Sequence, residues 1–134
     1  MLIFHIPGEP VPRRERIAYK RLIDDRAAIK RRIKWCLKSQ YREEPFATAL
    51  KVTFAFYMAI PVTTTRVRKR AMLEGRIRPT KKPDCSNLIK LYEDCMTGIA
   101  YQDDRFIVSV HADKFWAERP STIITVTPIE DPYD

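Results

Sequence analysis

The chain is poor in glycine and histidine, and it has no long apolar run. It contains 3 glycines and 2 histidines in 134 residues, and the glycines do not gather into a phosphate-binding loop. We find no Ser/His/Asp pattern of the kind that nucleophilic hydrolases use. No apolar stretch is long enough to span a bilayer, so we expect no membrane partner. The first residues also lack the basic flank of a signal peptide.

Cysteine is scarce as well, and its placement is informative. The three cysteines, Cys36, Cys85 and Cys95, form no C-x-x-C pair. An odd number argues against a disulfide framework and favours a reducing compartment, so we predict a cytoplasmic protein. The histidines, His5 and His111, both fall in predicted strands, where a structural role is favoured over metal binding.

Positive charge is what the chain has in excess. The net charge is +8 and the pI is about 9.6, which indicates a polyanionic partner. Residues 61–82 carry eight cations and one acid, Glu74, so they hold 8 − 1 = +7 of that excess. Either this segment binds nucleic-acid phosphates or it is a solvated loop. Its cations are Arg66, Arg68, Lys69, Arg70, Arg76, Arg78, Lys81 and Lys82. Trp35 and Trp116 lie outside it, and we predict that they pack instead of stacking on bases.

Hydrophobic periodicity predicts one α+β domain over residues 1–134. Alternation predicts strands at 2–6, 50–58, 106–117 and 122–128, and the strand at 50–58 directs five apolar side chains inward. Helical spacing predicts helices at 24–39 and 86–98. A short basic helix, capped by Thr64 or Thr65, should end near Leu73. The expected fold is therefore a small mixed β-sheet packed with two main helices. The helix at 24–39 also has a crowded basic face, which either touches phosphates or is solvated.

The most informative stretch runs from Lys81 to Lys90 and forms a loop-to-helix junction. Pro83 favours a helix start directly after it, with Asp84 or Ser86 as the N-cap. Three polar residues then share one helix face at spacings of three and four, and two acids follow in the next loop. The helix-face residues are Asn87, Lys90 and Asp94, and the loop acids are Asp103 and Asp104. The acids either converge on a divalent cation such as Mg2+ or serve only as helix cap and turn residues.

This stretch resembles the RusA family of Holliday junction resolvases. The family signature reads approximately K-P-D-x-D-N-L-x-K, then an Asp four residues on, then N-G and D-D. The matching residues are Lys82, Pro83, Asp84, Asn87, Leu88, Lys90, Asp94, Gly98, Asp103 and Asp104. Residues 6–10, followed by Arg16, are similar to the family's opening. The chain departs from the pattern at Ser86, where the family has its second Asp, and at Thr97, where Asn is frequent.

The resemblance implies a Mg2+-dependent endonuclease that cuts four-way junctions and other branched DNA as a homodimer. It implies that Asp84 and Asp104 hold the metal, with Asp103 as a further candidate ligand. Asn87 would orient an acid or a water molecule. Lys90 would stabilise charge on the scissile phosphate or position the nucleophile. Supporting roles fall to Ser86 and Asp94, and either Asp94 or Asp103 would compensate for the missing acid.

Two alternatives stay open at this point. Because Ser86 replaces an acid, the protein could bind junctions without cutting them. It could also be a general basic nucleic-acid-binding module whose acids are only caps and turns. Cleavage of a four-way junction separates the first interpretation from the other two, and competition by linear duplex separates the two alternatives.

Overall fold

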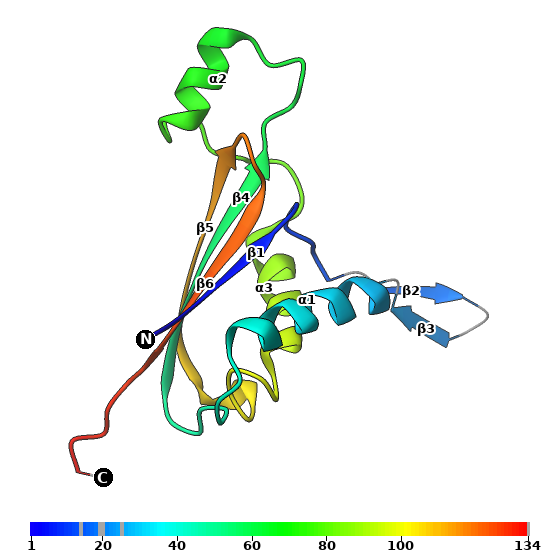
Figure 1. Cartoon of the computed structure of the whole chain (residues 1–134). Helices are drawn as coiled ribbons and strands as arrows, with labels where there is room; N and C mark the ends of the chain where they lie inside the picture. The colour runs from blue at the N-terminus through cyan, green and yellow to red at the C-terminus, as the bar shows by residue number, and fades with distance from the viewer. Residues whose placement is uncertain (14, 19–20, 25, 134) are drawn as a thin grey trace.

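A four-stranded mixed sheet with two helices on one side forms the body of the molecule (Figure 1). The computed structural model describes residues 1–13, 15–18, 21–24 and 26–133. The elements in chain order are β1 Leu2–Pro7, β2 Glu15–Ala18, β3 Arg21–Asp24, α1 Ala27–Gln40, β4 Leu50–Ala59, α2 Arg66–Leu73, α3 Cys85–Met96, the 3-10 turn η1 Asp104–Phe106, β5 Ile107–Ala117 and β6 Ser121–Pro128. No helix in this described part of the chain is long and apolar enough to cross a membrane.

The strand order in the main sheet is β1-β6-β4-β5. β4 pairs parallel with β5 and antiparallel with β6, and β6 pairs antiparallel with β1. The short connection after β5 therefore does not close a hairpin, because the chain passes over the end of β4 before β6 begins. The predicted mixed sheet is confirmed, and β4 lies at its centre.

The core forms where α1 and α3 pack on one face of the sheet. All five inward residues predicted for the central strand are buried: Leu50, Val52, Phe54, Phe56 and Met58. α3 contributes Leu88, Leu91 and Tyr92, which are buried at helical spacing. Burial of such side chains stabilises the fold by about 1.5–3 kcal/mol each. This packing fixes where the polar face of α3 points.

The N-terminal region differs from the prediction. Residues 15–18 and 21–24 pair as an antiparallel two-stranded sheet, β2–β3, which sequence analysis did not anticipate. The predicted helix at 24–39 begins three residues later, at Ala27, because Asp24 belongs to β3; residue 25 lies outside the described part of the chain. Strands of four residues are too short for periodicity to separate them from a helix entry. Figure 1 shows this hairpin projecting away from the main sheet.

The short basic helix is confirmed. α2 starts after Thr65, whose hydroxyl accepts the backbone N–H of Arg68 at 3.4 Å. Gly75 follows the helix with φ of 78°, a left-handed conformation that glycine adopts without steric cost. Figure 1 shows α2 beyond the end of the sheet, near the ends of β4 and β5. It therefore presents its cations at one end of the molecule.

Side chains cover parts of both sheet edges. On β1, the Gln40 amide accepts the His5 backbone N–H at 2.9 Å and donates to the His5 carbonyl at 2.8 Å. On β5, Arg78 donates to the carbonyl of Lys114 at 2.6 Å. Such contacts satisfy edge groups that would otherwise pair with another strand. The first half of β5 is less protected, because Val108 is 63% exposed and Val110 is 47% exposed.

Candidate functional site

Asp84 stands at the entry of α3, and its carboxylate is held by two neighbours. Oδ1 accepts the side-chain amide of Asn87 at 2.8 Å, and Oδ2 accepts the hydroxyl of Ser86 at 3.3 Å. Asp84 occupies the N-cap position, one of the two residues predicted for it, but its side chain makes no hydrogen bond to the helix backbone. The carboxylate is thus exposed and oriented at the positive end of a helix.

Lys114 fixes the loop that leads into this site. Its ammonium group donates to the carbonyls of Lys81 and Pro83, both at 2.8 Å. Hydrogen bonds from a charged donor contribute about 1.5–3 kcal/mol each. Lys114 was not among the predicted site residues. The available signal was a lysine in step with the core-facing positions of β5, between Ala112 and Trp116.

A second contact joins the N-terminal segment to α3. The backbone N–H of Arg13 donates to the carbonyl of Asn87 at 2.9 Å, and that of Val11 donates to the Tyr92 hydroxyl at 3.1 Å. The segment following the family-like opening therefore runs directly beside the first turns of α3. The backbone of Arg13 therefore lies beside the candidate site, a position for which no role was predicted.

Two further predicted acids, Asp94 and Asp104, lie close enough to Glu93 of α3 for their charges to act on it. Asp104 begins η1, and Asp94 forms a 3.9 Å ion pair with Lys30 of α1. Burial raises the pKa of Glu93; the positive charge of Lys90 opposes that rise, and the charges of Asp104 and Asp94 add to it. Glu93 was not predicted as a site residue. In the sequence, Glu93 is marked only by its position next to Asp94. Helical spacing alone does not identify it as a site residue.

Asp103 has an ordered carboxylate of its own. Its Oδ1 accepts the backbone N–H of Arg105 at 2.9 Å, and this bond is the main reason that its pKa lies below its usual value. Asp103 is exposed, as is Asp104. Asp103 therefore caps η1, which is the role predicted as the alternative to metal binding. Its carboxylate remains ionised and accessible.

The acids do not assemble a ready-made metal cage. Within the described residues, no group of three or more His, Cys, Asp or Glu side chains could hold a metal ion. Mg2+, however, commonly binds through one or two carboxylates and takes its other ligands from water and substrate phosphates. Asp84, exposed and oriented, fits that kind of site. Convergence of Asp84, Asp103 and Asp104 on one ion stays a prediction.

The cations of residues 66–82 divide into two groups. Four make ion pairs: Lys69 with Glu118, Arg70 and Arg76 with Glu74, and Arg78 with Asp113, at 2.9–3.0 Å. The others are exposed and, within the described chain, make no ion pair: Arg66, Arg68, Lys81 and Lys82. We call these four residues the unpaired basic set. Phosphate contacts from this set require no ion pair to break first.

Arg78 is the most constrained cation of the segment. Its guanidinium pairs with Asp113 at 2.9 Å and lies 4.2 Å from the centre of the Phe115 ring. Hydrogen bonds from Arg78 and then from His111 hold the pKa of Asp113 below its usual value. His111 lies in a strand, as predicted, and its Nε2 is 2.8 Å from Asp113. This cluster ties the basic segment to β5.

The two tryptophans behave differently. Trp116 packs against the core, which confirms the prediction for it. Trp35 is 73% exposed on α1, so the prediction that it packs is wrong. Helical spacing places Ile33 and Leu37 inward, and Trp35 lies between them on the outer side. Its position relative to the buried stripe was the signal that would have identified it.

Comparison with known proteins agrees with the motif. The sequence profile of the family described as "Endodeoxyribonuclease RusA" matches residues 7–127. The chain is also similar to the uncharacterized protein YqaN of Bacillus subtilis strain 168, with 29% identity over 94 residues. That match covers 68% of this chain and 66% of YqaN. The profile match spans both the N-terminal segment beside α3 and the acidic motif, and the chain therefore belongs to the RusA endodeoxyribonuclease family.

Proposed function

We propose that this protein is a structure-selective, Mg2+-dependent endonuclease that resolves four-way junctions and other branched DNA. The observation that carries the proposal is the exposed Asp84 carboxylate, oriented by Asn87 and Ser86 at the start of α3. Membership of the RusA family supports the reaction class. The unpaired basic set supports a DNA substrate, because phosphate contacts supply affinity without reading sequence.

The proposed roles follow from position on α3. Asp84 would hold the Mg2+ ion together with Asp104, and Asp103 would be a further ligand or support. A bound Mg2+ ion would neutralise charge on the phosphate and favour a hydroxide nucleophile near neutral pH. Asn87 keeps the Asp84 carboxylate in one orientation. Lys90 lies one turn further along the same exposed face and would bind the scissile phosphate.

One observation favours a second candidate function, junction binding without cleavage. Ser86 supplies a hydroxyl where the family has an acid, and the described residues form no three-acid group. The same basic surface would then hold a junction that the site does not cut. A general basic nucleic-acid-binding module is distinguished by competition, because linear duplex would then displace the junction at equal concentration. Cleavage of a synthetic four-way junction with and without Mg2+ decides for or against the nuclease.

The first prediction concerns the acids. We expect Asp84→Asn and, separately, Asp104→Asn to abolish cleavage of a four-way junction, because each removes a charged metal ligand. Junction binding, measured by anisotropy, should remain close to wild type, because it depends on the basic set. Glu44→Gln, an exposed acid far from α3 in sequence, is the matched control and should cut normally. A variant of either aspartate that cuts at wild-type rate removes that residue from the site.

The second prediction concerns Ser86. Its hydroxyl lies 3.3 Å from Asp84 Oδ2, so an aspartate at position 86 would place two carboxylates side by side. Two adjacent carboxylates repel each other, and a divalent cation bound to both offsets that repulsion. Ser86→Asp should therefore lower the Mg2+ concentration needed for half-maximal cleavage, whereas Ser86→Asn should not. An unchanged Mg2+ titration would show that another acid already provides this ligand.

The third prediction concerns the basic segment. Replacing Arg66, Arg68 and Lys82 by Ala should weaken binding to every DNA tested. It should also reduce the slope of log affinity against log salt by about 0.9 for each phosphate that the variant no longer neutralises. The matched control replaces Lys69, Arg70 and Arg76, which are paired with acids, and should reduce the slope less. Equal slopes for the two triple variants would count against the division of the cations made above.

The fourth prediction concerns assembly. Resolving a junction requires two cuts on symmetric strands, and one chain carries one Asp84 site; we propose a two-fold homodimer, the commonest closed assembly. Light scattering should give a dimer mass before DNA is added. Mixing wild type with excess Asp84→Asn protein should yield nicked, unresolved junctions. A monomer mass at assay concentration, with resolution unaffected by the excess variant, contradicts the proposal.

A further inference from the structure

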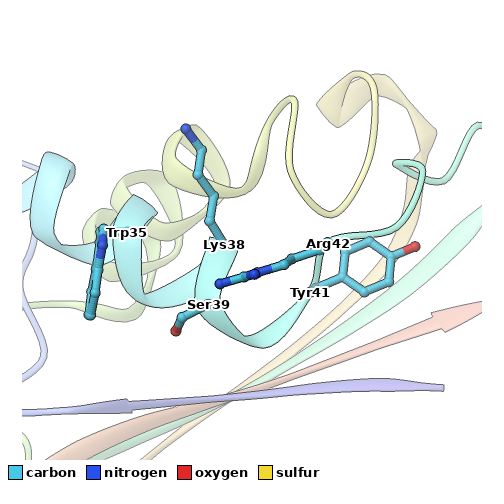
Figure 2. A pocket seen from close by; sticks show the side chains of 5 residues that line it. All are labelled: Trp35, Lys38, Ser39, Tyr41 and Arg42. Carbon is cyan, nitrogen blue, oxygen red and sulfur yellow. The ribbon is translucent and has the colours of Figure 1, made fainter.

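Trp35 lines two hollows beside α1. The first has a volume of about 290 Å³ and is lined by Trp35, Lys38, Ser39, Tyr41 and Arg42 (Figure 2). The second, of about 150 Å³, lies toward β1 and is lined by Trp35 with Ile6, Pro7, Arg32, Ile33 and Cys36. The Trp35 side chain is 73% exposed. The ring is therefore accessible, and it lines both hollows.

The rest of the first hollow is fixed in place. The Tyr41 ring stacks on Phe46 with 6.0 Å between centroids, and its hydroxyl donates to the carbonyl of Glu44 at 2.6 Å. Tyr41 is thus a wall of the hollow and not a free ring. Figure 2 shows Lys38 and Ser39 beyond Trp35 on the helix, with Lys38 extending away from Ser39, and Arg42 after the helix with its side chain reaching back toward Ser39. Lys38 lies one turn along the helix from Trp35, a rise of about 4.5 Å.

Positive charge is concentrated on the helix that carries this ring, and the acids Glu43 and Glu44 follow near Tyr41. Residues 26–42 contain seven cations and no acid. The nearest cations on the outer side, Arg31, Arg32 and Lys38, are exposed, as is Arg42 just after the helix. The centres of protein–protein interfaces are depleted of charged residues, so this composition does not suit a protein partner. An aromatic ring set among cations suits nucleic acid, where bases stack and phosphates pair with Lys and Arg.

We propose that Trp35 is a stacking platform for an unpaired base of single-stranded DNA, and that Lys38 and Arg42 bind the adjacent phosphates. A single strand is the better fit than duplex, because bases within a duplex have their faces covered by neighbouring bases. The proposal deepens the proposed function: it rests on a branched DNA substrate and assigns a single-stranded arm or gap in that substrate to α1. It adds a second DNA surface to the unpaired basic set.

The test uses tryptophan fluorescence. The chain contains only Trp35 and Trp116, so Trp116→Phe leaves Trp35 as the single emitter. Titrating this variant with a dT oligonucleotide should quench its fluorescence in parallel with binding, which is followed by anisotropy of a labelled strand. In the otherwise wild-type chain, Trp35→Ala should weaken single-strand binding on the order of tenfold. Trp35→Phe should recover part of that affinity, and duplex binding should change little.

Arg31→Ala is the matched control. Arg31 is exposed on the same helix but lines neither hollow. Its replacement should lower the salt slope by at most about 0.7, the value for one phosphate of a single strand, and leave quenching intact. Lys38→Ala should lower both the affinity and the slope. Circular dichroism checks that every variant is folded. Because Trp35 is exposed, we expect its replacement to leave the fold intact.

Several results would overturn the proposal. Unquenched Trp35 fluorescence at saturating single strand, or wild-type affinity in Trp35→Ala, would show that the ring touches no base. A change in light-scattering mass on Trp35→Ala, with DNA affinity unchanged, would assign the surface to a second copy of the chain instead. Failure of the nuclease proposal reads out separately, as absence of junction cleavage by wild-type protein, and it would not alter quenching by the oligonucleotide.

Discussion

The geometry of the candidate site depends on how the entry of α3 is held. The buried stripe of α3 packs on the central strand, and this packing sets the direction of its polar face. Lys114 then ties the preceding loop to β5 through two carbonyls at 2.8 Å. A partly buried ammonium group needs such partners, since an unpaired one would be costly. The same two bonds that satisfy Lys114 therefore fix the backbone that carries Asp84.

The distribution of charge changes once the chain is folded. In the sequence, residues 61–82 carry a net +7, because only Glu74 opposes eight cations. The fold adds Glu118 and Asp113 to their ion pairs, so the local balance becomes 8 − 3 = +5. Exposed ion pairs contribute little stability, and their main effect here is to neutralise particular cations of the segment. On α1, Lys30 pairs with Asp94 of α3.

Much of this fold followed from local pattern, and the failures share one cause. β4 alternates over its whole length, so all five of its inward residues were identified. α2 has a threonine cap and a following glycine, so both of its ends were identified as well. The β2–β3 hairpin was missed because four-residue strands carry too little period. Lys114 and Trp35 were missed because their roles depend on tertiary neighbours: the loop that passes over β5, and the helix side left uncovered. The motif identified Asp84 and Asn87, but the hydrogen bond between them depends on the folded conformation of the loop and helix.

The sheet edges limit how a second copy of the chain could associate. Gln40 pairs with both backbone groups of His5, and Pro7 at the end of β1 has no N–H to donate, so strand addition at β1 is disfavoured. Arg78 occupies the Lys114 carbonyl in the later half of β5. The first half of β5 is different, because Val108 and Val110 expose apolar surface there. Covering exposed apolar surface of this kind is favourable, because it removes the surface from water. If the proposed dimer forms through the sheet, this half of β5 is the edge best suited to pair with a second copy.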